Sequence, residues 1–234
     1  MPTKIVNIPP FQGFSPEALK FLKSLKRNNR RDWFQPRKEQ YDELLKYPMM
    51  ALVKSLGDEC RKFAPELRFI PEKAVLRIYR DTRFSHDKTP YKDFVAASIP
   101  FLGNKKKMHH IGVYFEITPG QFSIFAGLYQ PEGEALRKIR ESMTRNPDSL
   151  FDVIEDPKFK KHFKELLGEK LKTNPRGVSP DHPMIEFLRY KQFYVTKDFP
   201  ESVALRKDLP KIVAKEFEVA MPLLRWLNRS LKAW

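Results

Sequence analysis

The first sixty residues place apolar side chains at the spacing of amphipathic helices. Four of them recur at intervals of three or four positions: Ala18, Phe21, Leu22 and Leu25. This spacing predicts a helix with one buried face. Ser15 can cap it and Pro16 suits its first position, because proline lacks an N–H group that would be unpaired there anyway. Asn28 and Asn29 are expected to end it.

A second helical stretch is predicted to start near Pro36 and to turn Tyr41, Leu44 and Leu45 inward. Pro48 is expected to interrupt it, because proline cannot donate the next helical hydrogen bond. The apolar stripe then continues through Met49, Leu52, Val53, Leu56, Cys60 and Phe63. The stripe predicts that the lone cysteine is a core residue rather than a reactive thiol.

The middle of the chain changes to a period of two, which is typical of half-buried strands. Residues 74–83 alternate and predict a strand with Arg77, Tyr79, Asp81 and Arg83 on one face. Further strands are predicted at 94–100, 111–117 and 122–128. The turn Thr118-Pro119-Gly120-Gln121 joins the last two as a hairpin. Short connections between successive strands favour an antiparallel sheet.

Helical spacing returns after Pro131 and again near the C-terminus. We expect helices over about 132–145, 157–167 and 179–188, then a short strand over 190–195. The C-terminal helix is expected to bury Val213, Phe217, Ala220, Leu224, Leu227 and Leu231, and Pro222 is expected to kink it. The pattern predicts an α+β fold, with an antiparallel sheet flanked by N- and C-terminal helices, as a single domain over 1–234.

Composition and charge narrow the classes of function. The 234 residues hold 44 Lys+Arg against 29 Asp+Glu, a formal net charge of +15. A basic surface of this kind favours polyanionic partners. One cysteine permits no intrachain disulfide, and no signal peptide or run of 18 apolar residues is present. These features predict a cytoplasmic protein that does not enter a membrane.

Residues 77–92 combine basic, acidic and hydroxyl-bearing side chains at high density. The segment reads RIYRDTRFSHDKTPYK, and its candidate ligand-binding residues are Arg77, Arg80, Asp81, Arg83, Asp87, Lys88 and Tyr91. Guanidinium groups bind phosphate oxygens bidentately, and carboxylates between them fix their planes. An anionic, phosphate-bearing small molecule or a nucleic-acid backbone fits these groups. The alternative is a network of ion pairs within the protein itself. Individual ion pairs of this kind contribute little to stability when they lie on the surface.

Neighbouring segments hold further candidates. Asn29 and Trp33 either line the same cleft, where Trp33 offers a face for a base or sugar, or serve to cap and anchor the helix end. The basic loop Lys105–Lys107 is either solvated or touches phosphate. His109 and His110 point to opposite faces of a strand, so they form a poor metal site. His86 beside Asp87 is a possible general base.

The segment also resembles a known family. The pattern is Arg77-x-x-Arg80-Asp81-x-Arg83-Phe84-x-x-Asp87-Lys88-x-x-Tyr91, and further matches are Asn28-Asn29-x-x-x-Trp33-Phe34 and Gly127-x-Tyr129-x-Pro131. Together they resemble the DUF2461 family of uncharacterised proteins over nearly the whole chain. The resemblance implies a single α+β domain with the Arg/Asp/Lys/Tyr segment as its hallmark. It implies no reaction.

No GxGxxG, Walker loop, HExxH or GxSxG motif occurs, so no cofactor and no metal site is expected from a known signature. Four functions stay open. The first is binding of an anionic ligand, and the second is contact with a nucleic-acid backbone. The third is hydrolysis of a phosphoester with a divalent cation on Asp81 and Asp87, and the fourth is a purely architectural role for the motif.

Overall fold

The N-terminal helices of the computed structural model, which describes residues 8–83, 86–102 and 111–232, follow the predicted pattern. Helix α1 (Pro16–Arg27) begins after Ser15, whose Oγ accepts a hydrogen bond from the Ala18 backbone N–H at 3.2 Å. Asn28 caps its other end, as predicted. The apolar stripe of α1 is buried.

Helical backbone then runs with changes of pitch from Arg31 to Cys60. The elements are α2 (Arg31–Phe34), the 3₁₀ turn η1 (Gln35–Arg37), α3 (Lys38–Tyr41), the π turn η2 (Asp42–Lys46) and α4 (Tyr47–Cys60). The π turn ends at Lys46, two residues before Pro48. This agrees with the predicted interruption, because Pro48 has no N–H to donate to the Leu44 carbonyl.

Cys60 lies at the end of α4 and is fully buried. Burial disfavours the charged thiolate, and it raises the pKa of the Cys60 thiol to about 12. The finding supports the prediction of a core residue over a reactive thiol.

Four antiparallel strands form one sheet in the order β1-β2-β3-β4. They are β1 (Val95–Pro100), β2 (Ile111–Thr118), β3 (Gln121–Leu128) and β4 (Phe193–Pro200). Phe115 is the register partner of Ala97 on one side and of Ile124 on the other. The predicted hairpin is confirmed, with Gly120 at φ +99° in its turn. The predicted short strand at 190–195 is displaced to β4, which continues to Pro200.

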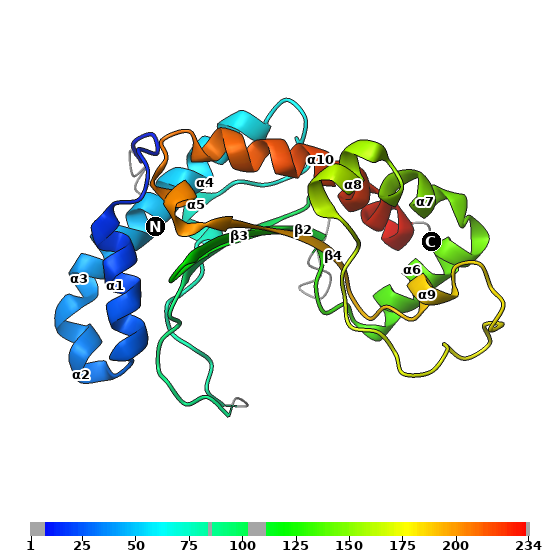
Figure 1. Ribbon diagram of the computed structural model, residues 1–234, viewed down its shortest axis with the longest axis horizontal. Helices are drawn as coiled ribbons and strands as arrows, with labels where there is room; N and C mark the ends of the chain where they lie inside the picture. Colours follow the sequence, from blue (N-terminus) through cyan, green and yellow to red (C-terminus); the bar gives the residue numbers. More distant parts are fainter. Residues whose placement is uncertain (1–7, 84–85, 103–110, 233–234) are drawn as a thin grey trace, which may run out of the picture.

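Helices α4 and α10 (Leu209–Lys232) cover one face of this sheet (Figure 1). Strand β2 turns Ile111, Val113, Phe115 and Ile117 toward them, and all four side chains are buried. The Phe115 and Phe217 rings lie 6.3 Å apart between sheet and helix. Pro222 lies inside α10 with its side chain exposed. The predicted α+β fold, a sheet flanked by N- and C-terminal helices, is therefore confirmed.

A buried carboxylate also fixes α10 on the sheet. Glu216 is only 5% exposed, and its two oxygens contact Lys197 Nζ of β4 at 2.9 Å and His162 Nδ1 at 2.6 Å. Buried charges are tolerated when they are paired in this way. His162 lies on α8 (Pro157–Phe163), so the contact joins three elements.

The remaining elements differ in length from the prediction. They are α5 (Pro71–Ala74), α6 (Gly133–Arg145), α7 (Asp148–Ile154), α9 (Ile185–Leu188) and the 3₁₀ turn η3 (Glu201–Leu205). The helix expected over 157–167 stops at Phe163, because Leu167 pairs with Tyr194 at the edge of β4 instead. The helix expected over 179–188 is reduced to α9, and the elements α5, α7 and η3 were not predicted.

The other face of the sheet is concave, with the N-terminal helices at one flank and α6 and α9 at the other (Figure 1). We call it the open face, since no described helix lies across it in this view. It carries the alternate residues of the strands, and on β2 these are half-buried: Gly112, Tyr114, Glu116 and Thr118. Polar positions therefore line a surface that the fold leaves accessible.

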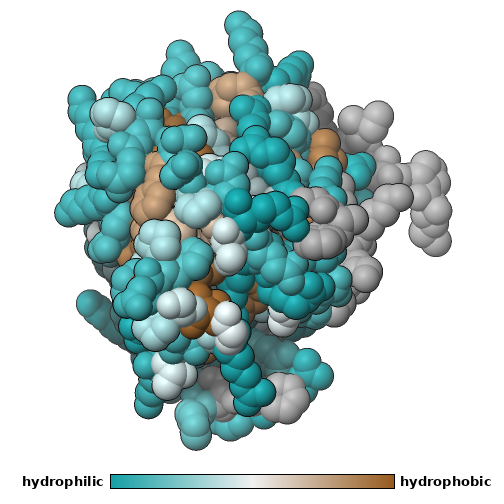
Figure 2. Space-filling model, turned by 90° about the vertical axis from the view of Figure 1, so that its right-hand side faces the viewer, coloured by the Kyte–Doolittle hydropathy of each residue, from teal (hydrophilic) through white to brown (hydrophobic). Residues whose placement is uncertain are grey.

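The flank built by α6 to α9 and the C-terminal end of α10 is mostly hydrophilic, with small hydrophobic patches between the polar side chains (Figure 2). In the described part of the chain, no helix is both long and apolar enough to cross a lipid bilayer.

Candidate functional site

The Arg/Asp/Lys/Tyr segment folds as an irregular antiparallel ribbon beside β1, made of residues 75–83 and 86–94. Val75 pairs with Ala97 and Tyr79 pairs with Tyr91 as isolated bridges. The prediction of a regular strand over 74–83 was therefore wrong. The physical reason lies in its partners, because the Leu76 N–H donates to the Ala96 carbonyl of β1, whereas the Arg80 N–H donates to the Pro90 carbonyl, so no single strand pairs with the whole segment.

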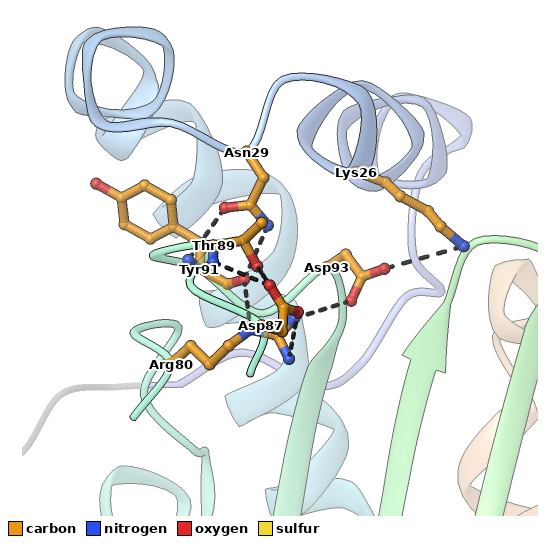
Figure 3. Close-up of polar contacts among 7 residues, drawn as sticks. All are labelled: Lys26, Asn29, Arg80, Asp87, Thr89, Tyr91 and Asp93. Atoms are coloured by element: carbon orange, nitrogen blue, oxygen red, sulfur yellow. Dashed lines mark hydrogen bonds and ion pairs between the residues drawn. The ribbon is translucent and has the colours of Figure 1, made fainter. Parts of the chain in front are cut away.

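Asn29 is the link between the end of α1 and the ribbon. Its Nδ2 donates to the Tyr91 carbonyl at 2.8 Å, and its Oδ1 accepts from the Tyr91 N–H at 3.1 Å (Figure 3). Arg80 Nε donates to the same carbonyl at 3.3 Å. The guanidinium of Arg80 also lies 3.3 Å from Asp87 and 3.7 Å from Asp93. Three of the predicted ligand residues, Asn29, Arg80 and Asp87, thus form an internal framework.

The Tyr91 ring anchors this framework in the hydrophobic core. It is 1% exposed and lies 4.1 Å from the Phe34 ring and 5.6 Å from the Tyr79 ring, centroid to centroid. Its hydroxyl accepts from Gln35 Nε2 at 3.3 Å. Tyr91 is therefore a core residue that holds the ribbon against α2 and η1, and its ring is not accessible to a ligand.

The tip of the ribbon carries the exposed members of the predicted site. Arg83 donates to both oxygens of Asp81, at 3.0 and 2.8 Å, and this pair lowers the pKa of the Asp81 carboxyl to about 2. Lys88 Nζ donates to the Thr82 carbonyl at 2.8 Å. The Thr89 backbone and hydroxyl donate to Asp87, which lowers the pKa of that carboxyl as well.

The base of the ribbon gathers cations against the sheet. Burial lowers the pKa of the Lys92 ammonium below its usual value, and the nearby charges of Arg77 and Arg80 lower it further. The carboxylate of Glu116 opposes this effect. Arg77 is exposed. Lys92 is thus a half-buried cation with two guanidinium groups in its electrostatic neighbourhood.

Glu116 faces Lys92 from the open face of the sheet. Burial raises the pKa of its carboxyl, the charges of Asp198 and Asp93 raise it further, and a hydrogen bond from the Tyr114 hydroxyl partly offsets this. Burial and that same hydrogen bond raise the pKa of the Tyr114 hydroxyl. The ribbon and the sheet therefore meet in a cluster of opposite charges.

Glu116→Gln is expected to stabilise the protein increasingly as pH rises. Folding raises the pKa of Glu116, so its contribution to stability is greatest in acid and is lost as pH rises through the folded pKa. Glutamine keeps an acceptor for Tyr114 without the charge. Thermal unfolding at about pH 4 and about pH 8, on either side of an ordinary glutamate titration, measures the difference.

Glu218→Gln, at an exposed position of α10, is the control for this measurement. If Glu116→Gln gains no stability relative to the parent at the higher pH, the charged Glu116 carboxylate does not destabilise the fold as expected.

The model of a family described as "Conserved hypothetical protein (DUF2461)" matches residues 17–226. The chain belongs to the DUF2461 family. A comparison with curated proteins finds no match, and neither does one with solved structures.

The DUF2461 match includes the ribbon, α1 and all four strands, so the charged cluster lies entirely inside the part of the chain that the family shares. Sequence reasoning overlooked Glu116, Tyr114, Asp198 and Asp93, and it counted Lys92 in the segment without placing it in the site. The alternation of 111–117 was the available signal, since Tyr114 and Glu116 occupy its polar face.

Trp33 packs on helix α1. Its ring lies 5.6 Å from Phe21, and Arg37 lies 4.7 Å above the ring centroid, so aromatic and cationic neighbours already cover it. The anchoring role is the better interpretation. His86 is exposed on the ribbon, whereas Lys105–Lys107, His109 and His110 lie outside the described residues. Within the described residues, no three His, Cys, Asp or Glu side chains gather in a way that would hold a metal ion.

Proposed function

We propose that the protein binds an anionic, phosphate-bearing ligand where the base of the ribbon meets the open face. Arg77 and Lys92 are the principal cations of this site, and Arg83 and Lys88 extend it toward the tip. Asn29, Arg80, Asp87 and Tyr91 are the framework that positions them. This division differs from the sequence-based expectation, which counted the framework residues as ligand contacts and did not include Lys92.

The observation that carries the proposal is the position of Lys92. Its ammonium is half-buried, and Arg77 and Arg80 both disfavour its charge. Like charges held close together in a region of reduced solvation raise the free energy of the empty site. A phosphate group, with several acceptor oxygens and a negative charge, relieves this repulsion by binding Arg77 and Lys92 together.

Arg77 is suited to the same task. It is exposed, and a guanidinium binds two phosphate oxygens in a planar fork. Arg80 is half-buried and already donates to the Tyr91 carbonyl and contacts two carboxylates. Arg80 therefore orients the site rather than meeting the ligand.

The double variant Arg77→Gln, Lys92→Gln is expected to lose binding of pyrophosphate and of inorganic polyphosphate. A ligand at 100 times its dissociation constant stabilises the folded state by about 2.7 kcal/mol, and a rise of several degrees in the melting temperature follows for a chain of this size. A thermal-shift titration of parent and variant at low salt measures the loss.

Lys211→Gln, Lys215→Gln is the matched control, because it removes the same charge from exposed positions of α10 on the other side of the sheet. If both double variants lose the stabilisation equally, the ligand responds to net charge alone and the proposed site is wrong. No stabilisation of the parent by either phosphate compound also contradicts it.

A further inference from the structure

A row of aromatic side chains crosses the open face of the sheet. Tyr114 lies 5.5 Å from Phe125, Phe125 lies 6.3 Å from Tyr194, and Tyr194 lies 6.0 Å from Tyr129, all measured between ring centroids. The rings come from β2, β3, β4 and the residue directly after β3. Consecutive rings are in aromatic contact, so the row is continuous.

The register of the strands explains why these rings share one face. Tyr114 is paired with Phe125, and Tyr194 is paired with Gly127, two residues further along β3. Side chains on paired positions, and on positions two apart, point to the same side of a sheet. That side is opposite to Phe115, which faces α10.

The row is accessible to a ligand in the described structure. Tyr129 is 58% exposed, and Tyr114, Phe125 and Tyr194 are each half-buried. Gly112 pairs with Gly127 across β2 and β3 on this face, and neither residue places a side chain between the rings. Neighbouring aromatic side chains that remain partly exposed are typical of surfaces that bind a partner.

We infer that the ligand of the proposed site is single-stranded nucleic acid, with its bases on the aromatic row and its phosphates along the ribbon. The inference rests on the proposed function, because the cations of the ribbon bind the backbone. Aromatic rings stack on any base, whereas basic side chains follow the phosphates, and single-strand binders combine the two.

The length of the row favours a polymer over a single nucleotide. Each centroid-to-centroid step is about the width of one base, and the row has three such steps. One nucleotide would contact only one end of it. The net charge of +15 supplies the attraction that any nucleic-acid strand requires.

The acidic groups of the site lie where bases, and not phosphates, would pass. Glu116 and Asp198 occupy the open face, and Tyr114 joins Glu116 to the aromatic row by a hydrogen bond. Carboxylates accept hydrogen bonds from the amino groups of bases, cytosine in particular. The carboxylates on the ribbon, Asp81 and Asp87, are already paired with arginines.

Fluorescence anisotropy with a labelled oligothymidine of about 12 nucleotides tests the inference. Tyr129→Ala, Tyr194→Ala is expected to weaken binding by about tenfold or more, since the loss of one stacked base accounts for such a factor. The same variant should bind inorganic polyphosphate as the parent does. Tyr47→Ala, at a tyrosine 54% exposed on α4, is the matched control and should leave both affinities unchanged.

Tyr129→Ala alone removes a mostly exposed ring and keeps the test available if the double variant does not fold. Unchanged oligothymidine binding in the aromatic variants, with polyphosphate bound normally, overturns the inference and leaves the proposed function standing. Equal affinity for duplex DNA also overturns it, because paired bases cannot reach the rings. If the parent binds neither polyphosphate nor oligothymidine, both proposals fail together.

Discussion

Tyr91→Ala is expected to lower the free energy of unfolding by about 3–5 kcal/mol, the usual cost of deleting a large aromatic ring from a packed core. The ring is 1% exposed and lies between Phe34 and Tyr79. Removing it leaves a cavity between the ribbon and the N-terminal helices. The ribbon then loses its main apolar attachment, so the arginines that it carries lose their fixed positions.

Tyr91→Phe is the control for this experiment, because it keeps the ring and removes only the 3.3 Å hydrogen bond with Gln35. A neutral hydrogen bond of this kind contributes about 1 kcal/mol. Urea-induced unfolding of both variants measures the difference. A cost for Tyr91→Ala as small as that for Tyr91→Phe would show that the ring is not the attachment of the ribbon.

Local patterns were sufficient to predict α1 and the hairpin. The stripe of α1, the cap at Ser15 and the Pro-Gly turn at Pro119-Gly120 all depend on residues within a few positions of one another. Hydrophobic periodicity reports which face is buried, and burial was the main determinant here. The same reasoning failed for residues 74–83, which alternate between apolar and polar side chains but do not pair as a regular strand.

That failure has a cause distant in sequence. Residues 74–83 divide their backbone hydrogen bonds between Ala96 of β1 and Pro90 of the ribbon, and the Tyr91 backbone is held by Asn29, which lies 62 positions earlier. Alternation reports the two faces of an extended segment but not which groups satisfy its backbone. A contact of this separation has no signature in spacing or composition.

The candidate site was only partly predictable for the same reason. The density of charge in residues 77–92 identified the segment, but not that Arg80 and Asp87 serve the framework while Arg77 stays exposed. Glu116 comes from a different strand, and its approach to Lys92 depends on how the ribbon folds against the sheet. The sequence identified the groups, whereas the tertiary structure shows which of them are held by internal contacts and which remain exposed.

Gly127→Ala is expected to destabilise the protein by about 3 kcal/mol or more, from two sources that act together. Gly127 has φ +147°, where an L side chain is strained by about 1–2 kcal/mol. A Cβ atom there would also lie 2.2 Å from the Phe193 carbonyl oxygen and 2.5 Å from the Tyr194 Cα. Backbone atoms must move to relieve that overlap, at a further cost of about 1–3 kcal/mol.

Gly120→Ala separates the two sources. Gly120 has φ +99°, and a Cβ there would meet nothing within 4 Å, so only the conformational strain applies. Thermal unfolding should therefore show a clearly larger loss for Gly127→Ala than for Gly120→Ala, and equal losses would mean that β3 and β4 separate without cost. Because Gly127 is paired with Tyr194, the same shift would displace one ring of the aromatic row. Gly127→Ala should thus weaken oligothymidine binding even where the variant remains folded, whereas Gly120→Ala should not.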